Sequence, residues 1–331
     1  MRLRVLAGAW AALLLAVPAL AGEVRIERRD PRFDALVPAG ARLEPIAEGF
    51  TWLEGPVWDA RRGVLLFSDV ARNAVFRWRP GGAPRSFLEP SGYSGKAAFP
   101  GREPGSNGLA FDGAGRLVLA QHGDRRIARR EPDGSLTVLA ERYEGRRLNS
   151  PNDLVFSRAG DLYFTDPPFG LARTFDDPAR ELPWSGVYRL AASGELTLLT
   201  AELRAPNGIA LSPSENTLYV SNSDAGNPVW MAYPLAGDGR LGPGRLLHDA
   251  RAWTRRWPGL PDGMEVDAAG NLWAAGPGGV HVFAPDGAHL GSLVLGVATS
   301  NCAFGPGQAE LYVTAGSRVY RVVLARSPGS P

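Results

Sequence analysis

Short runs in which apolar and polar residues alternate follow one another along most of the chain. Strict alternation over a few residues is typical of β-strands with one buried face, whereas an amphipathic helix repeats its apolar positions with the helical period. No segment shows a sustained helical period, and the runs are separated by turns rich in Gly, Pro, Asp and Ser. The pattern therefore predicts an all-β protein.

One hairpin-like unit recurs six times along the sequence. Each unit has a polar residue, a short alternating strand, a tight turn, and a second strand that ends in small or polar residues. The first residues of successive units are 39 to 55 positions apart, a spacing typical of propellers and solenoids. The units begin at Glu54, Asn107, Asn152, Asn207, Asp262 and Asn301.

Most units continue with a third apolar run, such as 74–78 or 186–190, and a more variable fourth, so each unit is predicted to form one four-stranded antiparallel blade. A single blade cannot bury both of its faces, and a closed ring gives every blade two neighbours. We therefore predict a six-bladed β-propeller that forms one domain over residues 22–331, with the apolar segment 43–46 completing the last blade. A pair of β-sandwiches is the alternative, but six in-phase copies of one hairpin favour the propeller.

Residues 1–21 have the features of an export signal. Arg2 and Arg4 precede an apolar run that extends to Leu20, and the run ends in a small-x-small pattern typical of signal cleavage. The run is short for a membrane span. We expect cleavage after Ala21, a periplasmic or secreted mature protein, and no membrane attachment after cleavage.

The composition excludes several kinds of site. The chain has 36 Lys and Arg against 34 Asp and Glu, so its charge is nearly balanced and gives no support to nucleic-acid binding. The basic cluster at 125–130 falls within a strand pattern, and we interpret it as a solvated strand face. Cys302 is the only cysteine, so neither an intramolecular disulfide nor a thiolate metal cluster can form.

The first residues of the six units are candidate metal ligands. The innermost strands of a propeller run along its central channel, so residues at the same end of each strand face one shared pocket. Two carboxylates and four amide oxygens would meet there, and such an all-oxygen set suits Ca²⁺, with Mg²⁺ or Mn²⁺ as alternatives. Asn-Gly and Asp-Gly are also common turn dipeptides, but the hairpin turn of each unit comes several residues later.

The units EGPVW, SPNDL, APNGI and LPDGMEVD resemble those of the gluconolactonase/regucalcin family of calcium-dependent six-bladed propellers, and EPGSNGLAFD with LAQHGDRR is similar to its bacterial gluconolactonase branch. The similarity extends over essentially the whole mature chain. It implies a sugar lactone as substrate, and Asp262 as a general base or nucleophile as well as a ligand. The metal ligands that it implies are Glu54, Asn152, Asn207 and Asp262.

The resemblance leaves other positions to be assigned. Asn107 and Asn301 are not usual ligands in the family, so we expect Asn107 to bind substrate or cap its strand, and Asn301 to cap its strand. The animal branch has an arginine where this chain has Ser150. That difference bears on which sugar the pocket would accept.

His122 is a second candidate for the proton acceptor in ring opening. A carboxylate bound to a cation is a weak base, whereas a neutral imidazole accepts protons near neutral pH. His122 ends the second strand of its unit, at the position that we match to Asp69, Asp166 and Asn222 in other units. A lone histidine with a structural role is the alternative.

Asn152, His122, Asp166 and Glu103 are candidate substrate-binding residues. Asp166 lies in FTDPPFG, where its alternative role is that of a strand-ending residue next to a turn. The insertion 89–106 shows no strand pattern and is predicted to be a lid or binding loop, with Tyr93, Lys96 and Glu103 as candidate contacts.

The sequence favours a metal-dependent hydrolase that opens a sugar lactone such as gluconolactone. Two alternatives remain, because a propeller fold alone does not fix function. The same site could serve a non-sugar lactone, an aryl ester or a phosphotriester. The chain could also be an exported, non-catalytic ligand-binding propeller with a structural ion.

Overall fold

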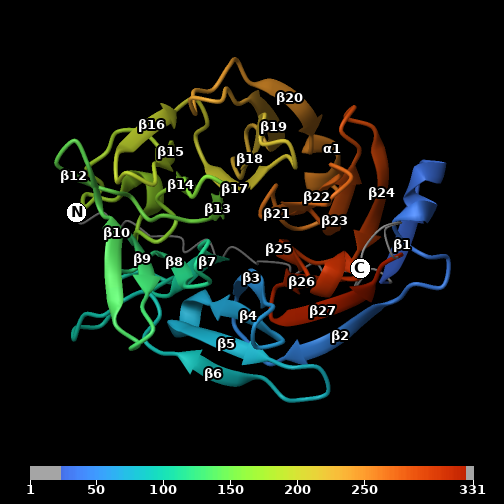
Figure 1. Cartoon of the computed structure of the whole chain (residues 1–331), viewed down its shortest axis with the longest axis horizontal. Helices are drawn as coiled ribbons and strands as arrows, with labels where there is room; N and C mark the ends of the chain where they lie inside the picture. The colour runs from blue at the N-terminus through green and yellow to red at the C-terminus, as the bar shows by residue number, and fades with distance from the viewer. Residues whose placement is uncertain (1–23, 326–331) are drawn as a thin grey trace, which may run out of the picture.

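The strands form a ring of blades around a central axis (Figure 1). The computed structural model describes residues 24–325, and within this part of the chain the strands make six blades, as predicted. The predicted export signal at 1–21 lies outside the described residues. None of the helices in the described part has the length and the apolar character needed to cross a membrane.

Each blade is an antiparallel sheet whose innermost strand faces the axis (Figure 1). The innermost strands are β3 (Leu53–Asp59), β7 (Ser106–Phe111), β13 (Leu154–Phe156), β17 (Pro206–Leu211), β21 (Met264–Val266) and β25 (Thr299–Phe304). The second strands are β4 (Val64–Asp69), β8 (Leu117–Gln121), β14 (Leu162–Asp166), β18 (Thr217–Asn222), β22 (Leu272–Gly276) and β26 (Glu310–Ala315). The third strands are β5 (Ala74–Trp78), β9 (Arg126–Arg130), β15 (Gly186–Leu190), β19 (Val229–Pro234), β23 (Gly279–Phe283) and β27 (Arg318–Val323). The fourth strands are β6 (Arg85–Leu88), β10 (Leu136–Ala140), β16 (Leu196–Thr200), β20 (Arg245–Asp249), β24 (His289–Val294) and β2 (Leu43–Glu48).

The ring closes where the two ends of the domain meet. Strand β2 pairs antiparallel with β27, with Leu43 opposite Val322, and so completes the sixth blade as the sequence predicted. One strand was not predicted: β1 (Arg25–Arg28) adds a fifth strand to the fifth blade through β24. Its sequence is mostly charged, and only Ile26 packs against a core cluster, so the alternation that marks the other strands is too short to detect.

The remaining elements are short. The two-residue strands β11 (Arg142–Tyr143) and β12 (Arg146–Arg147) make a small hairpin between the second and third blades. The helical elements are α1 (Arg251–Thr254) and the 3-10 turns η1 (Pro31–Ala35), η2 (Val70–Arg72), η3 (Thr174–Asp176) and η4 (Pro306–Gln308).

The hydrophobic core lies between neighbouring blades. Successive residues of a strand face opposite sides of its sheet. Leu65 of β4 therefore packs with Tyr312 of the sixth blade, whereas Leu66 packs with Leu109 of the second. Full burial of such side chains stabilises the fold by about 1.5–3 kcal/mol each. Because every blade is sandwiched in this way, the inner strands are fixed side by side around the axis.

Candidate active site

Five of the six residues that open the units converge on one cavity at one end of the axis. The cavity has a volume of about 400 Å³, and Glu54, Asn107, Asn152, Asn207 and Asp262 all line it. Asn301 does not: it lines a smaller cavity of about 80 Å³ in the channel below, where its amide oxygen accepts the N–H of Cys302 at 2.8 Å. The structure thus brings together all four predicted metal ligands.

Close backbone approach between inner strands explains the glycine that follows several of these polar residues. The N–H of Gly108 donates to the carbonyl of Asn152 in the next blade at 2.7 Å. A Cβ atom at Gly208 would lie 2.3 Å from the carbonyl oxygen of Asp262, so a larger residue would push the neighbouring strand away. The Asn-Gly and Asp-Gly dipeptides therefore stand at the starts of inner strands and do not form turns.

Amide oxygens in the cavity lack protein partners. Oδ1 of Asn107 and Oδ1 of Asn152 are buried and accept no hydrogen bond from the described residues. Nδ2 of Asn207 donates to Ser223 Oγ at 3.0 Å, which fixes the orientation of that amide. Leaving a buried acceptor unsatisfied costs about 1–3 kcal/mol, so these oxygens indicate a ligand.

The cavity also concentrates negative charge. Glu54 is only 3% exposed, and burial, with repulsion from Asp262, raises its pKa well above its usual value. Burial, with repulsion from Asp153 and Glu103, likewise raises the pKa of Asp262. No Lys or Arg is among the described residues that line the cavity. A bound cation would neutralise this charge.

The donor set fits a hard divalent cation. Within the described residues, no three Asp, Glu, His or Cys groups are close enough to hold a metal by themselves, so any ion here would need the amide oxygens as well as the two carboxylates. Carboxylate and amide oxygens together are the ligands that Ca²⁺ prefers, and Mg²⁺ and Mn²⁺ also bind oxygen. The residues that would hold the ion are Glu54, Asn152, Asn207 and Asp262.

His122 and Glu103 adjoin this set. His122 is fully buried, with Nε2 3.5 Å from Nδ2 of Asn152. Oε2 of Glu103 lies 3.0 Å from Nδ1 of His122, and the Glu103 side chain, 31% exposed, lines the cavity. Of the three candidate contacts in the loop 89–106, only Glu103 reaches the cavity, since Lys96 is exposed and Tyr93 packs on Phe99 with ring centroids 5.1 Å apart.

The structure corrects the position assigned to His122 within its blade. Ser106 pairs with Gln121 as Leu53 pairs with Asp69 and Pro206 with Asn222, so Gln121, not His122, occupies the position of Asp69 and Asn222. His122 is one residue further on. Its N–H donates to Gly105, just as that of Ser223 donates to Ala205. His122 and Ser223 are therefore the equivalent pair, and both adjoin the cavity.

Asp166 lies outside the lining of the cavity, contrary to the expected substrate contact. One of its oxygens accepts the N–H of Asn149 at 2.7 Å and the other that of Ser150 at 2.9 Å. Burial raises its pKa to about 7. Asp69 uses its carboxylate in the same way for the N–H groups of Thr51 and Trp52, so both residues brace the segment that leads into an inner strand.

Ser150 also acts on a loop. Its hydroxyl donates to the carbonyl of Pro167 at 2.6 Å and accepts the N–H of Gly170 at 2.9 Å. The loop that it holds carries Phe169, which lines the cavity. Ser150, where the animal branch has an arginine, therefore holds the loop that supplies this part of the cavity wall.

Several cavity residues were not predicted from the sequence. Most of them supply apolar wall, and most lie one to three positions before a unit start or in a loop joined to one. They are Trp52, Phe169, Ser223, Gly259, Leu260, Ala298 and Thr299. The signal that could have found them is their place next to the polar starts, since the segment entering each inner strand must border the same opening.

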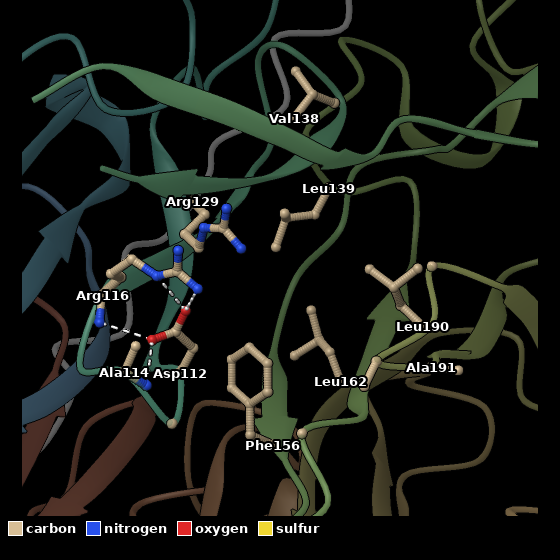
Figure 2. A pocket seen from close by; sticks show the side chains of 14 residues that line it. Asp112, Ala114, Arg116, Arg129, Val138, Leu139, Phe156, Leu162, Leu190 and Ala191 are labelled. Atoms are coloured by element: carbon tan, nitrogen blue, oxygen red, sulfur yellow. Dashed lines mark hydrogen bonds and ion pairs between the residues drawn. The ribbon is translucent and has the colours of Figure 1, made fainter. Parts of the chain in front are cut away.

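A second cavity, of about 390 Å³, lies between the second and third blades (Figure 2). Figure 2 shows Phe156 and Leu162 facing Leu139, with Arg116 turned onto Asp112. Arg116 Nε donates to Asp112 at 2.8 Å, and Arg129 Nε donates to Glu131 at 2.8 Å, so the charges are compensated. Among the described residues that line this cavity, no buried oxygen is unpartnered, and the carboxylate of Asp112 is paired with Arg116, unlike those of the axial cavity.

The sequence of residues 52–317 matches the family described as SMP-30/Gluconolactonase/LRE-like region. The chain belongs to this family. It is 41% identical over 304 residues to a gluconolactonase of Zymomonas mobilis, a match that covers 90% of this chain and 85% of the relative. The similarity to these relatives identifies the chain as an enzyme, a lactone hydrolase of the gluconolactonase type.

Solved structures of family members agree with the fold. A gluconolactonase from Xanthomonas campestris superposes with a TM-score of 0.79 at 35% identity, covering 91% of this chain and 95% of that one. A calcium-binding protein, regucalcin, from Agrobacterium tumefaciens superposes with a TM-score of 0.66 at 20% identity, covering 85% and 93%. At that identity the second likeness supports the propeller fold only.

Proposed function

We propose that this protein opens a sugar lactone of the gluconolactone type and that it needs a divalent cation, with Ca²⁺ the ion of choice. One observation carries the proposal. In a member of the gluconolactonase family, two carboxylates with raised pKa values meet two amide oxygens in one axial cavity, and neither amide oxygen has a partner within residues 24–325. The choice of ion is supported by the donor set, in which carboxylate and amide oxygens line the cavity together.

The cation would lie between Glu54, Asn152, Asn207 and Asp262. When bound, such an ion supplies Lewis acidity and favours negative charge on an oxygen beside it. The protein supplies the surroundings. Trp52, Phe169 and Leu260 give the cavity an apolar wall, and a volume of about 400 Å³ accommodates a monosaccharide lactone together with water.

Hydrolysis requires a proton acceptor for the attacking water. Water adds to the lactone carbonyl carbon, its proton passes to a base, the bond to the ring oxygen breaks, and that oxygen takes up a proton to give the open-chain hydroxy acid. Asp262 borders the cavity and is the base that we propose. Both ring nitrogens of His122 instead face protein groups, Glu103 and Asn152. Asn107 Oδ1, which accepts no hydrogen bond from the part of the chain that the structure describes, would accept one from a substrate hydroxyl.

Assays of metal-free and reconstituted protein test this function. We expect δ-gluconolactone opening, followed by proton release, to stop when the ion is chelated and to return with Ca²⁺, while the folded state persists by near-ultraviolet circular dichroism. Asp262→Asn should be inactive, and Asp112→Asn, at the other end of an inner strand, should behave as wild type. An undiminished rate in metal-free protein would refute the proposed chemistry.

A substrate panel separates the alternatives. Aldonolactones should be opened faster than non-sugar lactones, aryl esters and phosphotriesters by the same protein. Faster turnover of one of the other classes would replace the sugar lactone as substrate. Binding of lactones without turnover of any compound would favour the non-catalytic propeller with a structural ion.

We also propose that the protein is exported. The support is the order of Arg2 and Arg4, an apolar run and a small-x-small site ending at Ala21. N-terminal sequencing of the protein from a periplasmic or secreted fraction should give Gly22 as the first residue. Recovery of full-length chain from the cytoplasm alone would contradict export.

A further inference from the structure

Three polar side chains form a row from the inserted loop to the cation site. Glu103, in the loop 89–106, places Oε2 3.0 Å from Nδ1 of His122. Nε2 of His122 lies 3.5 Å from Nδ2 of Asn152, at the long end of hydrogen-bond distance. Oδ1 of Asn152 is then left buried without a partner among the described residues. The last atom of the row is thus a candidate ligand oxygen.

The contact between Glu103 and His122 lacks the geometry of a hydrogen bond, but the acceptor atoms near the imidazole still favour one placement of its proton. An ionised carboxylate only accepts, so Glu103 favours the tautomer of His122 that carries its proton on Nδ1. The carboxylate lies off the ideal N–H direction, but no better partner for Nδ1 exists within the described residues. In that tautomer Nε2 is an acceptor, which attracts the NH₂ end of Asn152 and repels its oxygen.

The opposite tautomer would reverse the amide. With the proton on Nε2, the histidine would attract Oδ1 of Asn152 and turn the NH₂ group toward the cavity. Amide N–H groups carry partial positive charge and cannot ligate a cation. The tautomer of His122 therefore decides whether Asn152 offers an oxygen or a repulsive dipole.

The row is held rigidly on the protein side. His122 has no exposed surface, and a Cβ at Gly170 would lie 2.6 Å from the Cβ of His122, so the loop after β14 packs directly on the histidine. The insertion is tied down as well: Asn73 Oδ1 accepts the N–H of Gly92 at 2.7 Å, and His122 N–H donates to Gly105 at 3.1 Å. The anchored loop thus presents Glu103 to His122 in a defined place.

We propose that Glu103 is a positioning residue for the cation site: through the tautomer of His122, it orients Asn152 so that Oδ1 faces the ion. The inference rests on the proposed function, because it presupposes a cation in the axial cavity. It assigns the inserted loop a role in ion binding.

Two substitutions separate this role from a simple effect of charge. Glu103→Gln removes the negative charge but keeps an oxygen that accepts from Nδ1–H, whereas Glu103→Ala removes both. Binding of Tb³⁺ can be followed by luminescence sensitised through Trp52, whose Nε1 lies 3.3 Å from Glu54, and Ca²⁺ affinity by competition. Lys96→Ala, an exposed change in the same loop, is the matched control.

We expect Glu103→Ala to weaken Ca²⁺ binding by about 10-fold or more, as second-layer substitutions at metal sites do, and Glu103→Gln and Lys96→Ala to stay within about threefold of wild type. Equal losses in the Gln and Ala variants would show an effect of charge and overturn the positioning role. No loss in either would overturn it as well. If the wild-type protein binds neither ion, the proposed function itself fails.

Nitrogen chemical shifts of labelled histidine give a readout that loss of folding cannot imitate. At a pH where the imidazole is neutral, the wild-type and Gln proteins should show His122 protonated on Nδ1, and the Ala variant should lose that preference. His122→Gln assigns the signal among the four histidines of the chain. A wild-type His122 protonated on Nε2 would refute the inference.

Discussion

Acid should destabilise this protein through a histidine cluster between the fourth and fifth blades. Trp253 of α1 is stacked between His248 and His281, with ring centroids 4.3 and 3.9 Å away, and His289 lies 5.1 Å from the same tryptophan. Burial lowers the pKa of His281 to about 3 and that of His289 to about 4. The folded protein therefore keeps both imidazoles neutral at a pH where the unfolded chain would protonate them.

Proton linkage gives the sign and the size of the change in the free energy of unfolding with pH. Above pH 6.5 His281 is neutral in both states and contributes no pH dependence. As the pH falls below 6.5, the unfolded state binds the proton and the folded state does not, so stability is lost progressively until the folded pKa of about 3 is reached. At pH 5 the loss from His281 alone is about 2 kcal/mol.

The assay is thermal unfolding at pH 7 and pH 5 for wild type and His281→Gln. Glutamine can still donate to the carbonyl of Pro277, which His281 Nε2 contacts at 3.0 Å, but it does not titrate. A change of about 2 kcal/mol corresponds to roughly 4 °C in a domain of this size, so the fall in Tm between the two pH values should be smaller by about that amount in the variant. Equal falls in the two proteins would refute the reasoning.

Three further predictions concern the cavity. Glu54→Gln and Asp262→Asn should each weaken Ca²⁺ binding by at least roughly 10-fold, because each removes one of two carboxylates facing the ion, and calorimetric titration measures the loss. Ca²⁺ binding in mildly acidic solution should release protons, since the pKa values of both carboxylates are raised without a cation. The heat of binding should then change with the ionisation enthalpy of the buffer, and an unchanged heat would contradict this prediction. Ser150→Ala should lower the free energy of unfolding by about 1–3 kcal/mol, because it removes two hydrogen bonds to the loop that carries Phe169. The loosened loop should raise KM more than it lowers kcat. Ser193→Ala, at an exposed position, is the control.

The repeat made the blades and the convergence of unit starts predictable from the sequence. Alternation is a local signal, and equivalent positions in a ring must face the same axis, so Glu54 and Asp262 could be placed together without any coordinates. Strand β1 was not predicted, because its pairing with β24 depends on tertiary contacts and not on an alternation of apolar and polar residues in its own sequence.

The misplacement of His122 arose because neighbouring units differ in length. Leu53 and Asp69 pair across a hairpin that is one residue longer than the one between Ser106 and Gln121, so counting along the sequence placed His122 one position too early. The role of Asp166 could not be predicted because it depends on which backbone N–H groups the preceding segment presents. The apolar wall was missed because its residues carry no repeat of their own.

The pairing of β2 with β27 sets the order in which this ring can be built. The partners Leu43 and Val322 are among the most widely separated residues in the domain, so a growing chain must be almost wholly synthesised before the sixth blade has its outer strand. Until then the first and sixth blades each have one face that no neighbouring blade covers, and such exposed faces promote association with other chains. Any factor that shields the nascent polypeptide would matter most during this final interval, when the circle is still open.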